Sequence, residues 1–234
     1  MGRPGAVLFD LDDTLYPERT FVDGGFRAVG RFLAPRLGRS SASIARRLRV
    51  LHDQDGRGRL FDTLLAESGV EDDPELVLAT VLVYRTHRPR LRPFDDVVAG
   101  LDRLRDARIP TGLVSDGLPS VQRRKLGALP DVARRLDVVV MTDELGRSHA
   151  KPSPDGFLVA CRLLDVDPTE AVYVANDPRK DFEGARSAGL RTIRAGLLPD
   201  EGGATTVRPD DGLDADDVAT AFAEAIDLAL GRRS

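Results

Sequence analysis

The hydrophobic positions of this chain follow two different patterns. A short unbroken apolar run, residues 6–9 (AVLF), stands near the N-terminus and is typical of a parallel strand that is buried on both faces of a sheet. In residues 21–91 the apolar positions recur at helical spacing instead. From residue 92 onward helical and strand patterns alternate, which predicts a parallel sheet with helices on both sides.

The alternating part of the chain predicts the order of the core elements. The expected later strands are residues 111–115, 136–141, 171–175 and 192–193, and the expected helices are residues 95–106, 119–126, 154–164, 182–188 and 216–230. Residues 198–213 carry no periodic signal and are expected to form a loop. The fold class that follows is α/β: a Rossmann-like three-layer core with a parallel sheet, built from residues 1–16 and 92–234.

Residues 17–91 are predicted to form an all-helical insertion between the first strand and the rest of the core. Four amphipathic stretches have their apolar positions within residues 21–33, 44–51, 60–65 and 76–84. Gly69 is expected to end the third helix, and Asp73 followed by Pro74 is a typical start for the fourth. Periodicity leaves two arrangements open: a separate helical subdomain, or four helices packed on the sheet.

Composition narrows the class of protein. With 234 residues, of which 41% are hydrophobic, the chain suits one medium domain or a core with an inserted subdomain. A single cysteine, Cys161, excludes an internal disulfide and fits a reducing compartment. No apolar run has the length of a signal peptide or a membrane span, so we expect a soluble cytoplasmic protein without a membrane partner. The net charge of −4 argues against nucleic acid as a partner, while monomer and homodimer both stay open.

Three carboxylates directly follow the first predicted strand. Asp10, Asp12 and Asp13 lie where a central strand ends, which is the sheet edge at which ligands bind in open α/β folds. Acids gathered there repel one another and lose hydration unless a cation or a proton lies among them, and carboxylate oxygens suit Mg²⁺. The alternative is an Asp-rich turn, in which Asp12, Asp13 and Thr14 bond to their own backbone.

The sequence from Asp10 to Thr14, DLDDT, resembles the DxDxT motif of the haloacid dehalogenase (HAD) superfamily of phosphatases and phosphotransferases. The resemblance implies that Asp10 is the nucleophile that becomes a phosphoaspartate, that Asp12 is the acid/base, and that Thr14 helps to fix the loop. Two acids suit this chemistry because an alkoxide leaving group needs a proton in addition to an attacking nucleophile. The dehalogenases that name the superfamily lack the second acid, which this chain has.

Two later segments resemble the second and third motifs of this superfamily. Ser115, in LVSDG, matches a position where a hydroxyl and the following backbone N–H groups hold phosphoryl oxygens, so Ser115 and Asp116 would bind the substrate phosphate. The family commonly has Asn where this chain has Asp116. Lys151, in HAKPSPDGF, is similar to a lysine that neutralises both the nucleophile and the phosphate, which implies a catalytic and a phosphate-binding role. The residues by themselves also allow an ordinary Ser-Asp-Gly turn and a solvated surface lysine.

The segment VYVANDPRKDFEGARSAG is similar to the fourth motif, in which an acid just after the strand and another four or five residues on bind Mg²⁺. The family commonly has Gly-Asp where this chain has Ala-Asn176. We expect Asp177 to face the site, because Pro178 turns the chain where the strand ends, and Asn176 to contribute a hydrogen bond. The metal ligands implied by the resemblance are Asp10, Asp12, Asp177 and Asp181.

The four motifs occur in the order of the family and extend over essentially the whole chain. They imply a Mg²⁺-dependent phosphatase with a helical cap, of the phosphoglycolate phosphatase or sugar phosphatase kind, in which electrostatic stabilisation carries most of the catalysis. The implied substrate is a small phosphorylated metabolite (a sugar phosphate, nucleotide or phospho-acid), hydrolysed through a phosphoaspartate. Two other functions stay open: a phosphomutase of the β-phosphoglucomutase kind, and a catalytically weak HAD-fold protein that binds a metabolite.

Overall fold

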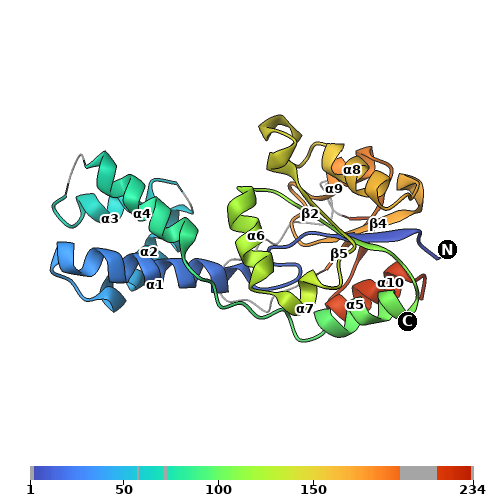
Figure 1. Cartoon of the computed structure of the whole chain (residues 1–234), viewed down its shortest axis with the longest axis horizontal. Helices are drawn as coiled ribbons and strands as arrows, with labels where there is room; N and C mark the ends of the chain where they lie inside the picture. Colours follow the sequence, from blue (N-terminus) through green and yellow to red (C-terminus); the bar gives the residue numbers. More distant parts are fainter. Residues whose placement is uncertain (1–2, 57, 71–72, 196–214, 233–234) are drawn as a thin grey trace. The chain divides into compact units, whose positions relative to one another are not determined.

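The computed structural model describes residues 3–56, 58–70, 73–195 and 215–232 (Figure 1). The chain forms two compact units. The core unit consists of the segment that ends at Pro17 and the segment that begins at Arg92, and the helical unit is Glu18–Leu91. The loop expected at residues 198–213 lies outside the described residues.

The core unit is built on a parallel sheet whose described strands follow the order β3-β2-β1-β4-β5-β6. The strands are β1 (Ala6–Phe9), β2 (Thr111–Ser115), β3 (Val138–Met141), β4 (Ala171–Ala175), β5 (Arg191–Arg194) and β6 (Asp217–Val218). The first strand of the sequence lies between β2 and β4 and is fully buried, as its unbroken apolar run predicts. The prediction of a Rossmann-like core with a parallel sheet is therefore confirmed.

Helices cover both faces of this sheet, which gives three layers. The described helices of the core unit are α5 (Val97–Asp106), α6 (Pro119–Gly127), α7 (Pro130–Ala133), α8 (Asp155–Leu163), α9 (Phe182–Ser187) and α10 (Phe222–Ala229), with 3₁₀ turns at Thr142–Glu144, Arg147–His149 and Pro168–Glu170. Helices α8 and α9 lie on one face of the sheet, and α5 and α10 lie on the other (Figure 1). Phe157 of α8 packs edge-on against Tyr173 of β4, and Phe222 of α10 packs against Phe9 of β1.

The end of the core unit differs from the sequence-based expectation. The segment predicted as one helix, residues 216–230, begins with the edge strand β6, and the helix starts only at Phe222. The strand pairs with β5, and just beyond it the N–H group of Ala219 donates to the carbonyl oxygen of Arg194 at 2.8 Å. Two paired residues are too short to give a periodic signal, so the hydrophobic pattern of the following helix masked the strand.

The helical unit contains α1 (Glu18–Leu37), α2 (Ser41–Asp55), α3 (Leu60–Ala66) and α4 (Pro74–Thr86). The unit has an apolar core of its own, to which Phe26, Leu33, Ile44, Leu48 and Leu64 contribute. At Gly30, α1 approaches α2 so closely that a Cβ atom would lie 2.3 Å from the carbonyl oxygen of Ser41. Asp73 caps α4 by accepting a hydrogen bond from the N–H group of Leu76, as its position before Pro74 indicates. None of the described helices combines the length and the apolar character that a membrane span requires.

Candidate active site

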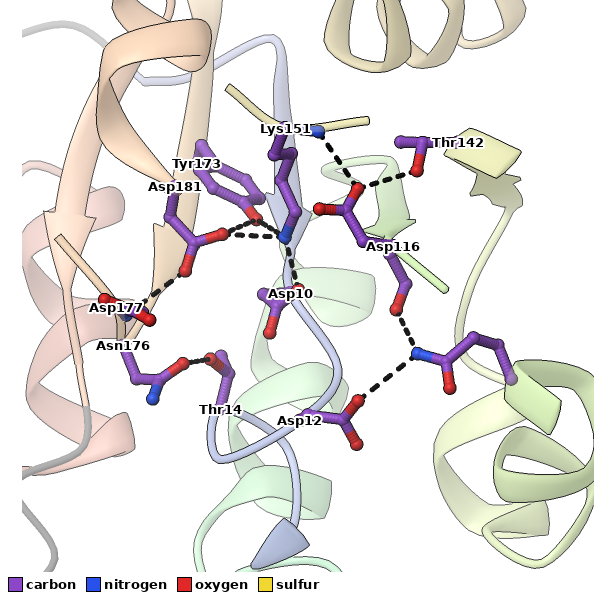
Figure 2. Close-up of polar contacts among 12 residues, drawn as sticks. Asp10, Asp12, Thr14, Asp116, Thr142, Lys151, Tyr173, Asn176, Asp177 and Asp181 are labelled. Atoms are coloured by element: carbon purple, nitrogen blue, oxygen red, sulfur yellow. Dashed lines mark hydrogen bonds and ion pairs between the residues drawn. The ribbon is translucent and has the colours of Figure 1, made fainter. Parts of the chain in front are cut away.

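The candidate site lies at the carboxyl edge of the sheet in the core unit. Strands β1, β2 and β4 are parallel neighbours, with Phe9 opposite both Leu113 and Val174. The residues that follow these strands therefore reach the same edge. Figure 2 shows Asp10, Asp116 and Asn176 directed into one region together with Lys151. Each of the four motifs therefore contributes a residue to this edge of the sheet.

Lys151 is the centre of a buried network of polar groups. Its ammonium group donates to Asp10 Oδ1 at 2.5 Å, to Asp181 Oδ1 at 2.7 Å and to the Tyr173 hydroxyl at 3.0 Å. The Tyr173 hydroxyl in turn donates to Asp181 Oδ1 at 3.2 Å. The side chains of Lys151, Asp10 and Asp181 are 1%, 3% and 0% exposed, so this lysine is not a solvated surface residue.

Burial and neighbouring charges shift the pKa values in this network. Burial raises the pKa of Asp10 to about 6, although the nearby Lys151 charge acts in the opposite direction. Burial alone would lower the pKa of Lys151, but the negative charge of Asp10 and its neighbours raises it well above its usual value. Burial also raises the pKa of Tyr173, which keeps the phenol neutral. Burial would also lower the pKa of a second lysine, Lys180, but the negative charge of Asp10 and other nearby carboxylates raises it above its usual value.

Asp10 has one carboxylate oxygen that the protein does not satisfy. While Oδ1 accepts from Lys151, the buried Oδ2 has no hydrogen-bond partner among the described residues. A buried carboxylate oxygen without a partner is costly. Strand β4 holds the backbone of Asp10 in place, because the Asp10 N–H group donates to the carbonyl oxygen of Val174 at 3.0 Å. This oxygen is thus fixed in a place where a cation or an electrophilic phosphorus atom would relieve its cost.

Asp12 lies in a separate polar network. Both of its oxygens accept from the ammonium group of Lys125, at 2.8 Å and 2.6 Å. The hydroxyl of Tyr16 donates to Oδ1, and the side-chain amide of Gln122 donates to Oδ2 at 3.3 Å. Burial alone would raise the pKa of Asp12, but Lys125 and the other donors lower it below its usual value. The ionised form of Asp12 is therefore favoured in this arrangement.

The two residues of the second motif, Ser115 and Asp116, have different hydrogen-bond partners. Ser115 Oγ accepts from the Gln122 amide at 2.7 Å and is buried at the end of β2. The Asp116 carboxylate turns away from Ser115 and accepts from Thr142 Oγ1 at 2.6 Å and from the Lys151 N–H group at 3.1 Å. The Asp116 side chain thus connects β2 to the segment that carries Lys151, and its carboxylate is engaged in these two hydrogen bonds.

The fourth motif has a different register from the one expected. Thr14 Oγ1 donates to Asn176 Oδ1 at 3.3 Å, so position 176 faces the loop that follows Asp10 (Figure 2). The carboxylate of Asp177 instead accepts from the backbone N–H and the guanidinium of Arg179, at 3.0 Å to 3.1 Å. Asp181 Oδ2 accepts from the Asp177 N–H group at 3.1 Å. The expectation that Asp177 faces the site must be corrected, because its side chain closes its own turn.

The four carboxylates expected to bind a metal are not gathered around one point. Within the described ranges, no group of three or more His, Cys, Asp or Glu side chains is arranged to hold a metal ion. Asp12, Asp177 and Asp181 each have basic or backbone donors as partners. The unsatisfied Oδ2 of Asp10 does suit a hard cation, and Mg²⁺ often takes only one or two protein carboxylates together with water and substrate phosphate. A cation therefore fits at Asp10.

Comparison with known proteins assigns the chain to a family. The model of the haloacid dehalogenase-like hydrolases matches residues 4–189. The chain belongs to this family. Among its relatives, the glyceraldehyde 3-phosphate phosphatase of Methanopyrus kandleri is 36% identical over 195 residues, which are 81% of this chain and 82% of that protein. The phosphoglycolate phosphatase of Xylella fastidiosa is 29% identical over 197 residues, 82% and 80% of the two chains.

Solved structures of haloacid dehalogenase-like proteins have the same fold. The HAD phosphatase of Thermococcus onnurineus aligns over 100% of both chains, with a TM-score of 0.64 and 25% identity. The superfamily predicted from the DxDxT motif is thereby confirmed. The predicted enzyme class, a phosphoric monoester hydrolase, agrees with the family and with its phosphatase members. HAD phosphatases generally use a divalent metal ion.

Sequence reasoning missed several residues that bond to the predicted site residues. They are Tyr16, Gln122 and Lys125 at Asp12, Tyr173 at Lys151, Thr142 at Asp116 and Arg179 at Asp177. The spacing of Gln122 and Lys125 was an available signal, since residues three apart share one side of a helix. Tyr173 was also visible as the polar side chain within an otherwise apolar strand.

Proposed function

We propose that this protein is a Mg²⁺-dependent phosphatase that hydrolyses a small phosphorylated metabolite through a phosphoaspartate at Asp10. The observation that carries the proposal is the state of Asp10: its carboxylate is buried, Lys151 holds one oxygen, and the other oxygen has no partner among the described residues. Burial weakens the solvation of a nucleophile, and the lysine offsets the repulsion between a carboxylate and a phosphate.

The proposed reaction has two steps that use the same two acids. In the first, a carboxylate oxygen of Asp10 attacks phosphorus, the bond from phosphorus to the leaving oxygen breaks, and an alcohol leaves after taking a proton from Asp12. The protonated form of Asp12 that this step uses is the minor form while the carboxylate is paired with Lys125. In the second, water gives a proton to ionised Asp12 and attacks phosphorus, and the bond to Asp10 breaks. Inorganic phosphate is released, and both acids return to their starting states.

The other site residues would bind and orient the phosphate. Lys151 would neutralise the phosphoryl group together with Asp10, and Ser115 Oγ would bind a phosphoryl oxygen with the backbone that follows it. When bound, Mg²⁺ would offset the negative charge of the phosphate and the nucleophile. We assign it to Asp10, whose Oδ2 has no partner among the described residues, with the side-chain oxygen of Asn176 as a further ligand, because Asn176 faces the loop that follows Asp10.

The relatives guide the choice of substrate. Two of them are phosphatases for glyceraldehyde 3-phosphate and phosphoglycolate, which are small phosphorylated carbonyl or carboxyl compounds. We infer that this chain acts on a substrate of the same class, with glyceraldehyde 3-phosphate as the first compound to test, and that the helical unit serves as the cap that the family resemblance implies.

A panel of phosphate esters tests the proposed function. Phosphate release is measured with glyceraldehyde 3-phosphate, phosphoglycolate, sugar phosphates and nucleotides, with Mg²⁺ or EDTA, and with Asp10→Asn as the matched variant. We expect Mg²⁺-dependent release without a bisphosphate activator, and a loss on the order of 10³-fold or more in Asp10→Asn. Release that needs a bisphosphate would indicate a phosphomutase, and near-normal turnover in Asp10→Asn would exclude the phosphoaspartate.

A further inference from the structure

Helix α6 has a polar side that is buried. Gln122 and Lys125 are 2% and 4% exposed, and their spacing places them on the same side of the helix. The neighbouring cation Arg124 is exposed. Lysine is almost never fully buried unless it is paired, so the position of Lys125 requires an acidic partner. That partner is Asp12.

The contact between Lys125 and Asp12 restricts the carboxylate strongly. The lysine Nζ lies 2.8 Å from Oδ1 and 2.6 Å from Oδ2, so it bridges the two oxygens. The Tyr16 hydroxyl donates to Oδ1 from the same loop, where the Asp13 N–H group donates to the Tyr16 carbonyl oxygen at 2.9 Å. Asp13 has a φ of 55°, a conformation that aspartate tolerates in turns. Asp12 is therefore held both by its own loop and by α6.

Gln122 connects this acid to the second motif. Its side-chain amide donates to Ser115 Oγ at 2.7 Å and to Asp12 Oδ2 at 3.3 Å. Gly117, with a φ of 104°, provides the turn between β2 and α6, and a Cβ atom there would lie 3.9 Å from the Gln122 side chain. The turn therefore brings α6 back over the end of the strand. One helix thus links the residue proposed as acid/base to the residue proposed to bind phosphate.

We propose that Lys125 and Gln122 are positioning residues that hold the Asp12 carboxylate in the orientation from which it exchanges protons with the leaving oxygen and with water. The inference rests on the proposed function, because it takes Asp12 as the acid/base. The two residues of α6 have different roles. Lys125 fixes the direction of the carboxylate, and Gln122 sets its distance from the phosphate-binding serine. A misplaced acid slows proton transfer, since such transfer requires hydrogen-bond reach.

The dependence of the rate on the leaving group tests this inference. Phosphoryl transfer to Asp10 is measured in single-turnover experiments with p-nitrophenyl phosphate, whose leaving group needs little protonation, and with the alkyl phosphate that the wild type hydrolyses fastest in the panel. We expect Lys125→Met to slow transfer from the alkyl phosphate at least about tenfold more than transfer from p-nitrophenyl phosphate. Arg124→Met is the matched control, and it should change neither rate.

Further variants test the positioning role even if Lys125→Met does not fold. Gln122→Met removes only the bridging amide and should show the same selectivity at about two- to fivefold, so it decides the question if Lys125→Met does not fold. Lys125→Arg should recover part of the selective loss because it restores a cation. Equal losses on both substrates in folded Lys125→Met, or no loss, would overturn the positioning role. Absence of selectivity in Asp12→Asn would instead overturn the acid/base role in the proposed function.

Discussion

The ammonium group of Lys151 lies 2.5 Å from Asp10 Oδ1, although the two residues are 141 positions apart in the sequence. The same ammonium group is 2.7 Å from Asp181. One lysine thus pairs with two buried carboxylates whose side chains are at most 3% exposed. A bound phosphate would add further negative charge to this arrangement, which is the physical reason why we propose a cation at Asp10.

The contributions of Lys151 and Asp10 to the free energy of unfolding should be strongly coupled. We expect Lys151→Met to lower the free energy of unfolding by about 3 kcal/mol, because it leaves Asp10 and Asp181 without their buried cation. Asp10→Asn should recover stability in the Lys151→Met background, with a coupling energy of about 1 to 3 kcal/mol in a double-mutant cycle measured by urea denaturation. Additive effects would mean that the two residues do not interact in solution.

The stability of the metal-free protein should depend on the charge of Asp10. Burial raises the pKa of Asp10 from 3.8 to about 6, so the folded protein binds this proton more tightly than the unfolded chain. The favourable contribution is complete below about pH 4 and is lost as the pH rises through about 6. Relative to Asp10→Asn, the wild type should therefore lose on the order of 2 kcal/mol over this range. Urea denaturation in EDTA measures the difference, and parallel pH profiles would contradict it.

Position 176, and not position 177, should control the metal requirement. Asn176 faces Thr14 in the loop after Asp10, whereas Asp177 is bonded to Arg179. A carboxylate binds Mg²⁺ more strongly than an amide oxygen, so Asn176→Asp should lower the Mg²⁺ concentration for half-maximal activity several-fold. Asp177→Asn, the matched variant one position away, should change it less than about twofold. The opposite ranking would show that Asp177 reaches the metal after all.

Asp116 should act on catalysis through the position of Lys151. Its carboxylate accepts from Thr142 Oγ1 and from the Lys151 N–H group. Asp116→Ala should lower kcat by about tenfold or more, since a small displacement of a charged group in a site is costly. Asp116→Asn keeps an acceptor oxygen and should retain most activity, and Thr142→Val should have an intermediate effect. Steady-state kinetics with the best substrate of the panel gives these values. Equal activity of the Ala and Asn variants would remove the positioning role.

The sequence by itself determined the sheet and the order of the site residues along it. The apolar run at β1 and the alternation of strands and helices predict a parallel sheet, and the ends of parallel strands share one edge. Asp10, Ser115 and Lys151 could therefore be assigned to that edge from motifs alone. Their identity and their location follow from local patterns, which each segment carries independently of the others.

Only the tertiary structure decided what surrounds these residues. The spacing of Gln122 and Lys125 indicates only that they share one side of a helix, whereas the burial of Lys125 against Asp12 depends on where the turn at Gly117 places α6. The choice between Asn176 and Asp177 depends on how the backbone rotates after β4, where the alternation of side chains along a strand no longer applies. In the folded chain the Asp177 carboxylate bonds to Arg179 within its own turn, while Asn176 meets Thr14, which is 162 positions away, and such a long-range contact exists only once the chain has folded.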